Sequence, residues 1–216
     1  MKTIIISLGG SIVSTATDNA AVRQQYADWL LELAKTNVVA VIVGGGYRAR
    51  QAIEQAKQQS ADFTDEQLDQ IGIEATRVNA NVMQELCGVT GSLIIDPHVQ
   101  LPKQPSLVFG AGWVPGRSTD YDAVALAIEN GVKTVYNLSN VDRVYDKDPK
   151  QYPDAQPLPL DITWDQLLDI IGKDWQPGLN APFDPIAAQL AKEYHVTVKL
   201  VRGMALFDNA GTVIHS

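Results

Sequence analysis

The sequence predicts an α/β fold, a three-layer αβα sandwich around an open and mainly parallel sheet. Short apolar segments rich in β-branched residues alternate along the chain with segments of helical periodicity. These apolar segments lack a regular alternation of polar and apolar residues, which is typical of strands that helices cover on both faces. Glycine-rich segments follow several of them, at the strand ends where such sheets bind ligands.

Length and charge narrow the possibilities further. The 216 residues favour a single domain, residues 1–216, and the 17 basic and 25 acidic residues give a formal net charge of −8. This charge argues against a polymeric nucleic acid as partner, because such a surface needs clustered Lys and Arg. The single cysteine, Cys87, excludes a disulfide framework. No apolar run approaches the ~18 residues that cross a membrane, and no signal-peptide pattern is present, so we expect a cytoplasmic protein without membrane contact.

In the first half of the chain, apolar runs predict strands over residues 4–8, 38–43, 93–95 and 107–109. An apolar face over residues 20–34 predicts a helix that Asp18 can cap. A second helix is expected to begin near Tyr47, directly after three glycines. Residues 64–67 fit the capping-box pattern and open a third helix that extends to Leu86.

In the second half, residues 122–129 predict a helix and residues 133–138 a strand, before an irregular, proline-rich segment at 140–159. A second capping box at residues 163–166 opens a short helix to Ile171. Asp184 and Pro185 are a favourable N-cap and first-turn pair for a helix to Tyr194. A strand at 196–201 follows, and the tail at 205–214 resembles a hairpin around residues 208–211.

Two glycine segments are candidate phosphate sites. Gly9, Gly10 and Ser11 follow the first strand, where glycine lets the backbone approach a phosphate; a plain β-turn is the alternative. Residues 44–46 are three glycines between a strand and a helix, where free N–H groups and the helix dipole favour an anion. Arg50 lies within reach of that anion. Neither the dinucleotide fingerprint nor the P-loop pattern occurs in the chain.

Two further segments carry polar groups suited to chemistry. Residues 110–120 end in Arg117, Ser118, Thr119 and Asp120, which combine a guanidinium, two hydroxyls and a carboxylate just before a helix. Asp120 or Asp122 can orient catalytic cations, or can merely cap that helix. The second segment, residues 140–150, is rich in charge and is otherwise explained as a solvated loop.

Taken in order, these four segments resemble the amino acid kinase family, and within it the branch of archaeal-type uridylate (UMP) kinases. Residues 69–80 are similar to that branch's segment on the monophosphate side, and residues 115–120, 171–173 and 184–188 also match it. The resemblance implies transfer of the ATP γ-phosphoryl group to UMP with Mg²⁺. It also implies an acceptor lobe over about residues 1–130 and an ATP lobe over about residues 131–216.

The residues and the resemblance together give an expected site. At the catalytic centre we expect Gly9, Gly10, Ser11, Asp120, Asp122 and Asp184. Around the UMP acceptor we expect Gly44, Gly45, Gly46, Arg50, Asp69, Gly72, Arg117, Ser118 and Thr119. Around ATP we expect Asn140, Asp142, Val144, Tyr145, Lys147 and Asp148. No metal site made by the protein alone is expected.

Departures from the family pattern keep alternatives open. Many members carry a lysine two or three residues before the first glycine pair, where this chain has Ile6 and Ser7, and Arg143 replaces a usual glycine. One alternative is a kinase of the same fold for another small phosphate or carboxylate. The other is a non-catalytic nucleotide-binding or metal-storage protein resembling the molybdenum storage proteins. The resemblance also implies a homohexamer and a role in pyrimidine biosynthesis.

Overall fold

The computed structural model describes residues 1–17, 19–60, 62–149, 151–174, 181–204, 206 and 211–216. Its centre is a seven-stranded sheet of order β3-β2-β1-β4-β6-β7-β5. The strands are β1 (Thr3–Leu8), β2 (Val38–Val43), β3 (Ser106–Gly110), β4 (Thr134–Ser139), β5 (Asp161–Thr163), β6 (Thr197–Arg202) and β7 (Thr212–His215). Neighbouring strands are parallel except for the antiparallel pair β6 and β7. The expected open and mainly parallel sheet is therefore confirmed.

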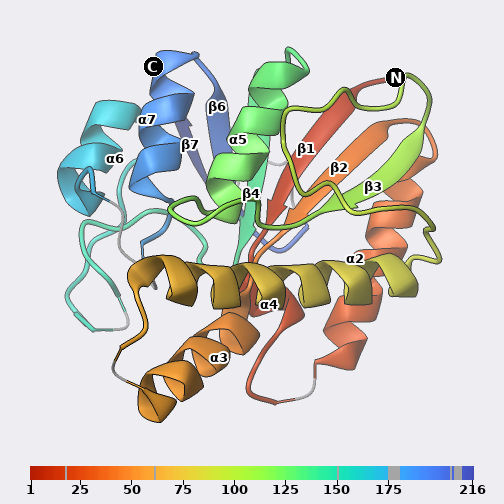
Figure 1. The fold of residues 1–216 in the computed structure, drawn as a ribbon. Coiled ribbons are helices and arrows are strands. Elements are labelled where there is room, and N and C mark those ends of the chain that lie inside the picture. Colours follow the sequence, from red (N-terminus) through yellow and green to blue (C-terminus); the bar gives the residue numbers. More distant parts are fainter. Residues whose placement is uncertain (18, 61, 150, 175–180, 205, 207–210) are drawn as a thin grey trace.

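Helices cover both faces of this sheet (Figure 1). They are α1 (Gly10–Val13), α2 (Ala20–Ala34), α3 (Gly46–Gln59), α4 (Asp65–Leu86), α5 (Thr119–Glu129), α6 (Trp164–Ile171) and α7 (Pro185–Glu193). Helices α1, α2 and α4 bury their apolar residues on one face, and α5, α6 and α7 on the other. Helix α3 packs against α4, outside the layer that touches the sheet. None of the helices in the described ranges is both long and apolar enough to cross a membrane.

The core explains the continuous apolar strands. Ile4 and Ile6 of β1 point into the cluster beneath α2 and α4, whereas Ile5 points into the cluster beneath α5 and α7. All six residues of β2 are buried. Because both faces of the central strands are covered, neither face selects polar side chains, and the alternation typical of a half-exposed sheet is absent.

Local capping signals are also confirmed. Thr64 and Thr163 each accept a hydrogen bond from the backbone of the glutamine three residues later, whose side chain returns the contact. Asp184 caps α7, with Pro185 at its first position. Each cap pairs an amide that the first helical turn leaves without an acceptor, which sets where these helices begin.

Several expectations about elements are wrong. Residues 93–95 form no strand: Ile94 makes a single bridge to Gly110, and the chain then turns where Pro97 has no N–H and Asp96 accepts from the His98 amide. In the tail, β7 pairs antiparallel with β6, and residues 205 and 207–210, which include most of the expected turn, lie outside the described residues. Strand β5 was not expected.

Two helix starts also differ from expectation. Asn19, not Asp18, occupies the N-cap of α2, and Asp18 lies outside the described residues. Helix α5 begins at Thr119, three residues before the expected start, because the Ser118 hydroxyl accepts from the Tyr121 amide at 3.1 Å. Neither Asp120 nor Asp122 therefore serves as the cap, and both carboxylates lie in the first turn of the helix.

Candidate active site

Two adjoining cavities lie at the carboxyl ends of the parallel strands. The larger, of about 610 Å³, is enclosed by the two glycine segments, α3, α4 and the loop before α5. The smaller, of about 380 Å³, is enclosed by the loop after β4 and the end of α6. Ser139, Asn140, Ala181 and Pro182 line both cavities. The arrangement offers two binding sites with a common wall.

The two glycine segments touch backbone to backbone at the floor of the larger cavity. A Cβ on Gly10 would lie 2.1 Å from the Gly46 nitrogen and 2.5 Å from the Gly44 carbonyl carbon. Gly46 has a φ of +58°, a conformation that residues with side chains rarely adopt. This approach requires glycine on both sides, so Gly10 is more than a turn residue.

The loop before α5 is held by three of its own amides. Gly112 donates to the Thr76 hydroxyl at 2.8 Å and Gly116 donates to Asp69 at 2.7 Å, both acceptors on α4. Trp113 donates to Asp122 on α5 at 3.1 Å. The loop is thereby fixed between α4 and α5 and forms one wall of the larger cavity.

Two arginines lie at this cavity. Arg50, exposed on the first turns of α3, lines it beside the glycines. Arg117 also lines it, with its guanidinium 4.8 Å from the centre of the Tyr121 ring and one nitrogen donating to the Gly116 carbonyl. The larger cavity therefore combines backbone amides with two positive side chains, which is the chemistry that binds a small anion.

Three carboxyl groups, those of Asp120, Asp122 and Asp184, lie close enough for their charges to interact, and one of them lines the larger cavity. The Oδ1 atom of Asp120 accepts from the Ser7 hydroxyl at 2.6 Å and from the Asn137 amide at 2.8 Å. Burial, with the neighbouring charge of Asp184, raises the pKa of Asp120 to about 6. Burial also raises the pKa of Asp122 to about 8, and the charges of Asp184 and Asp120 add to this shift. Such shifts are typical of functional carboxyl groups and of buried structural ones alike.

The three groups differ in where they point. Asp120 lines the larger cavity. Asp122 is 1% exposed, and its Oδ1 atom has no partner among the described residues. Asp184 is buried as well; its Oδ1 atom caps α7, and its Oδ2 atom has no partner within the described ranges. Only Asp120 of the three meets the cavity directly.

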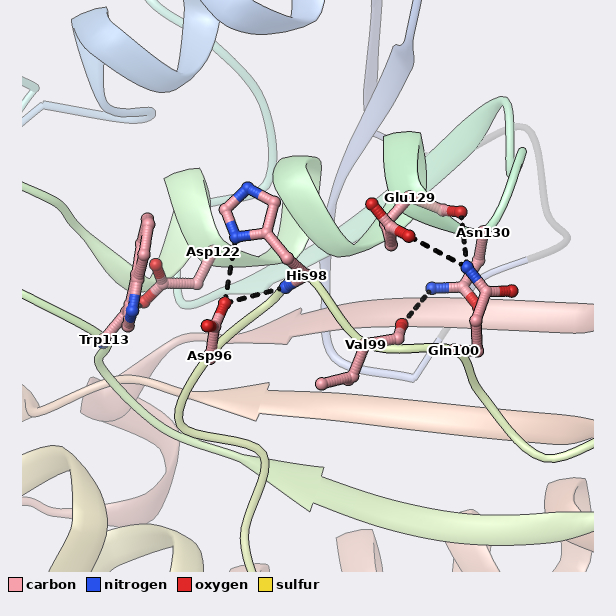
Figure 2. A network of polar contacts seen from close by, with 8 residues as sticks. All are labelled: Asp96, His98, Val99, Gln100, Trp113, Asp122, Glu129 and Asn130. Atoms are coloured by element: carbon pink, nitrogen blue, oxygen red, sulfur yellow. Dashed lines mark hydrogen bonds and ion pairs between the residues drawn. The ribbon is translucent and has the colours of Figure 1, made fainter.

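Figure 2 shows the polar contacts of residues 96–100 with their neighbours near Trp113 and at the end of α5. Asp96 accepts from the His98 amide and lies 2.9 Å from its ring nitrogen, and the His98 ring lies 5.0 Å from the Trp113 ring. Gln100 donates to Glu129, and Asn130 donates to the Val99 carbonyl. The segment is thus fastened to the C-terminal end of α5, and its His98 ring contacts the loop residue Trp113.

In the smaller cavity, the cations are already paired with acids. Lys147 lies 2.7 Å from Asp154 and 5.4 Å from the centre of the Tyr152 ring. The Tyr145 hydroxyl donates to Asp142 at 3.1 Å, which raises the pKa of that phenol. Arg143, the departure from the family pattern, lines the cavity. This side is a charged groove with one aromatic ring on its wall.

Most residues expected at the site lie on these two cavities. Those on the larger cavity are Gly9, Gly10, Ser11, Gly44, Gly45, Gly46, Arg50, Asp69, Gly72, Arg117, Ser118, Thr119 and Asp120, and it shares Asn140 with the smaller one. Those on the smaller cavity are Asn140, Tyr145, Lys147 and Asp148. Lining neither are Asp122, Asp142, Val144 and Asp184. Val144 is fully buried in the core, so its side chain faces away from the cavity.

Sequence reasoning missed several polar residues of the larger cavity. Ser7 and Asn137 interrupt apolar strands and meet at Asp120, and Thr76 holds Gly112. A polar residue near the carboxyl end of an otherwise apolar strand was the available signal. The Asn79 side chain also donates to the Gly44 carbonyl. Asn79 lies in the segment 69–80, but the sequence assigned it no role.

Comparison with known proteins agrees with this geometry. The sequence profile of the Amino acid kinase family matches residues 2–202. A uridylate kinase of Methanobrevibacter smithii is 32% identical over 205 residues, 93% of this chain and 89% of that relative. The crystal structure of uridylate kinase from Archaeoglobus fulgidus matches with a TM-score of 0.79 and 28% identity, over 99% of this chain and 100% of that one. An aspartate kinase from Synechocystis shares the fold, with a TM-score of 0.76 at 19% identity, over 99% of this chain and 40% of its own. The chain belongs to the amino acid kinase family.

Proposed function

We propose that the chain is a uridylate kinase, which transfers the γ-phosphoryl group of ATP to UMP and releases UDP and ADP. The observation that carries this proposal is the pair of cavities that share a wall at Ser139 and Asn140. Nucleotides bound in both would bring their phosphates together there, as in-line transfer requires. The uridylate kinases among the relatives support UMP as the acceptor.

We assign UMP to the larger cavity. The amides of residues 44–46 lie at the N-terminus of α3, where the helix dipole stabilises an anion, and Arg50 adds a full charge. The Asp69 Oδ2 atom accepts from the Gly116 amide, and its Oδ1 atom would accept from the ribose hydroxyls. Gly72 leaves room for the nucleoside, and residues 117–119 would contact UMP near the point of transfer.

We assign ATP to the smaller cavity. Asn140, Tyr145 and Asp148 would surround its nucleoside, and Lys147 would reach its phosphates. Asp142 would act through Tyr145, because its carboxylate accepts a hydrogen bond from the Tyr145 hydroxyl. Val144 would contribute by its backbone, since its side chain is in the core and its amide donates to Thr212 at 3.0 Å.

The chemistry needs positioning more than proton transfer. The attacking oxygen of UMP belongs to a phosphate that is already an anion, so no general base is required. The backbone around Gly9, Gly10 and Ser11 would surround the transferred group, while Asp120 would organise the polar side chains beside it. Asp122 and Asp184 are buried behind Asp120 and would act on the reaction only through their effect on Asp120.

Magnesium fits this site as a companion of ATP. The described residues hold no group of three or more His, Cys, Asp or Glu side chains that could bind a metal. Mg²⁺ commonly binds through one or two carboxylates together with substrate phosphates, and Asp120 is the carboxylate on the cavity wall. When bound, the ion would supply positive charge to the transferring phosphates.

The broader setting is part of the same proposal. We infer an acceptor lobe over about residues 1–130 and an ATP lobe over about residues 131–216, because most residues that line the larger cavity precede residue 130 and all that line the smaller one follow it. A cytoplasmic homohexamer that serves pyrimidine biosynthesis is what the family resemblance supports. Scattering in solution tests the oligomeric state.

The alternatives are less well supported. A cavity of about 610 Å³, walled partly by Ile53 and Ile73, suits a nucleoside rather than an acceptor as small as carbamate. A nucleotide-binding or metal-storage protein would bind without transfer. Metal analysis of protein from its natural source would detect molybdenum or tungsten in that case.

A panel of acceptors tests the proposal. Purified protein with ATP and Mg²⁺ is given UMP, CMP, isopentenyl phosphate, carbamate or acetylglutamate, and ADP formation is followed. We expect kcat/KM for UMP to exceed that for every other acceptor. A preference for a non-nucleotide acceptor would assign the same fold a different substrate. Transfer to none of them would reject a kinase.

A further inference from the structure

Asn79 on α4 holds the glycine segment of the larger cavity from behind. Its side-chain amide donates to the carbonyl oxygens of Gly44 and Gly45, both at 2.9 Å. Its side-chain oxygen accepts from the Arg48 guanidinium at 3.0 Å. The residue is 1% exposed and does not line the cavity, so it cannot touch a ligand there.

These contacts determine where the glycine amides point. In a trans peptide the C=O and the N–H of one unit point in opposite directions. The Gly44 carbonyl points to Asn79, so the Gly45 N–H points away from it. The Gly45 carbonyl points to Asn79 and also accepts from the Ala49 amide at 3.2 Å, so the Gly46 N–H likewise points away from Asn79. Within the described ranges neither amide has a hydrogen-bond partner, and both glycines line the cavity.

We propose that Asn79 is a positioning residue that presets the phosphate-binding amides of the acceptor site. This inference rests on the proposed function, since it names the phosphate of UMP as the group those amides receive. Glycine has the widest choice of backbone conformations, so three in a row need an external restraint to hold one of them. A buried carboxamide is suited to this task because its NH₂ group can donate to two carbonyls while its oxygen accepts from a third group, here Arg48.

Gln84 provides a matched control on the same helix. It is also a buried carboxamide on α4, and its side chain donates to the Gly91 carbonyl at 2.9 Å, away from the cavity. N79L and Q84M each replace a buried carboxamide by an apolar side chain of similar shape. N79L removes two hydrogen bonds to glycine carbonyls and one from Arg48, and Q84M removes one to a glycine carbonyl, yet only N79L affects residues 44–46.

The experiment compares UMP with uridine, which lacks the phosphate, by titration calorimetry on the full chain. We expect N79L to weaken UMP binding by about 10- to 100-fold, the scale of lost buried hydrogen bonds. Uridine binding and the KM for ATP stay within about twofold of the wild type, and Q84M binds UMP like the wild type. N79D serves as a second variant if N79L does not fold; its carboxylate repels the two carbonyls and weakens UMP binding at least as much.

Equal losses for UMP and uridine in N79L, or equal UMP affinity in N79L and Q84M, would overturn the positioning role. The proposed function is judged separately by whether the wild type forms UDP. If it does not, inorganic phosphate replaces UMP in the same titration. If phosphate binds to the wild type and binds more weakly to N79L, the role of Asn79 in positioning the phosphate-binding amides stands. Equal binding to both, or binding to neither, would reject that role.

Discussion

The hydroxyl of Ser7 on β1 donates to the carboxylate of Asp120 on α5 at 2.6 Å, across 113 positions of sequence. Asn137 on β4 donates to the same oxygen at 2.8 Å. Many members of the family carry a lysine at position 6 or 7 of this chain. Here a neutral hydroxyl and a neutral amide orient the carboxylate instead, at the junction of the two cavities.

This relationship predicts a charge-dependent role for Asp120. In D120N the side-chain oxygen still accepts from Ser7 and Asn137, so the local geometry is retained while the negative charge is removed. We expect kcat to fall about 100-fold, the scale of one preorganised electrostatic group, with little change in the KM for UMP or ATP. Steady-state kinetics measures this. A D120N variant with wild-type kcat would show that the carboxylate is only structural.

The contact between Gly10 and Gly46 predicts a steric effect. In G10A the added Cβ would meet the Gly46 nitrogen at 2.1 Å, so the two glycine segments must separate. We expect a lower melting temperature and loss of nearly all activity. At Gly72, inside α4, the nearest atom to an added Cβ is Ile53 Cδ1 at 3.6 Å, an ordinary contact, so G72A should melt no lower than the wild type. Equal melting temperatures for G10A and the wild type would contradict the close approach.

The raised pKa of Asp122 predicts that its contribution to the free energy of unfolding falls as pH rises. Its pKa is raised from 3.8 to about 8, so the folded protein holds this proton more tightly than the unfolded chain. The stability that this provides is complete below pH 3.8 and is lost as pH rises through about 8. In D122N the amide cannot ionise and its oxygen can still accept from Trp113. Urea unfolding should show D122N gaining on the wild type between pH 5 and pH 8; identical slopes for both would refute this.

The ion pair of Lys147 and Asp154 predicts competition with ATP. Lys147 must leave Asp154 to reach a phosphate, and an exposed pair of this kind is worth about 0.2–1 kcal/mol. D154N should therefore lower the KM for ATP by up to about fivefold at low salt, with kcat unchanged. In a K147M background the same substitution should have no effect. A D154N effect that persists in K147M would place the cause elsewhere.

The parts of the fold that local signals determine could be predicted from the sequence. The capping boxes at Thr64 and Thr163 and the cap at Asp184 are set by neighbours within three residues. Strand β5 has only three residues and is a strand because β7, some fifty positions later, pairs with it. Residues 93–95 carry the right composition, but only Ile94 finds a partner. Pairing over long distances is not visible in local composition.

In the candidate site, too, local signals could be predicted from the sequence, whereas contacts between distant segments could not. The glycine segments were visible because three consecutive glycines are costly without a purpose. The choice between Asp120 and Asp122 was open, because it depends on where α5 begins. Two positions along a helix correspond to a rotation of about 200°, so one carboxyl faces the cavity and the other faces Trp113. Ser7, Asn137 and Asn79 act through contacts between distant segments, which the sequence does not display.

The central claim is tested most directly by mixing purified protein with ATP, Mg²⁺ and UMP and separating the nucleotides over time. The account predicts UDP and ADP in equal amounts, with formation abolished when UMP is omitted. Binding of both nucleotides without any UDP or ADP would contradict it and would leave a nucleotide-binding protein on the amino acid kinase fold.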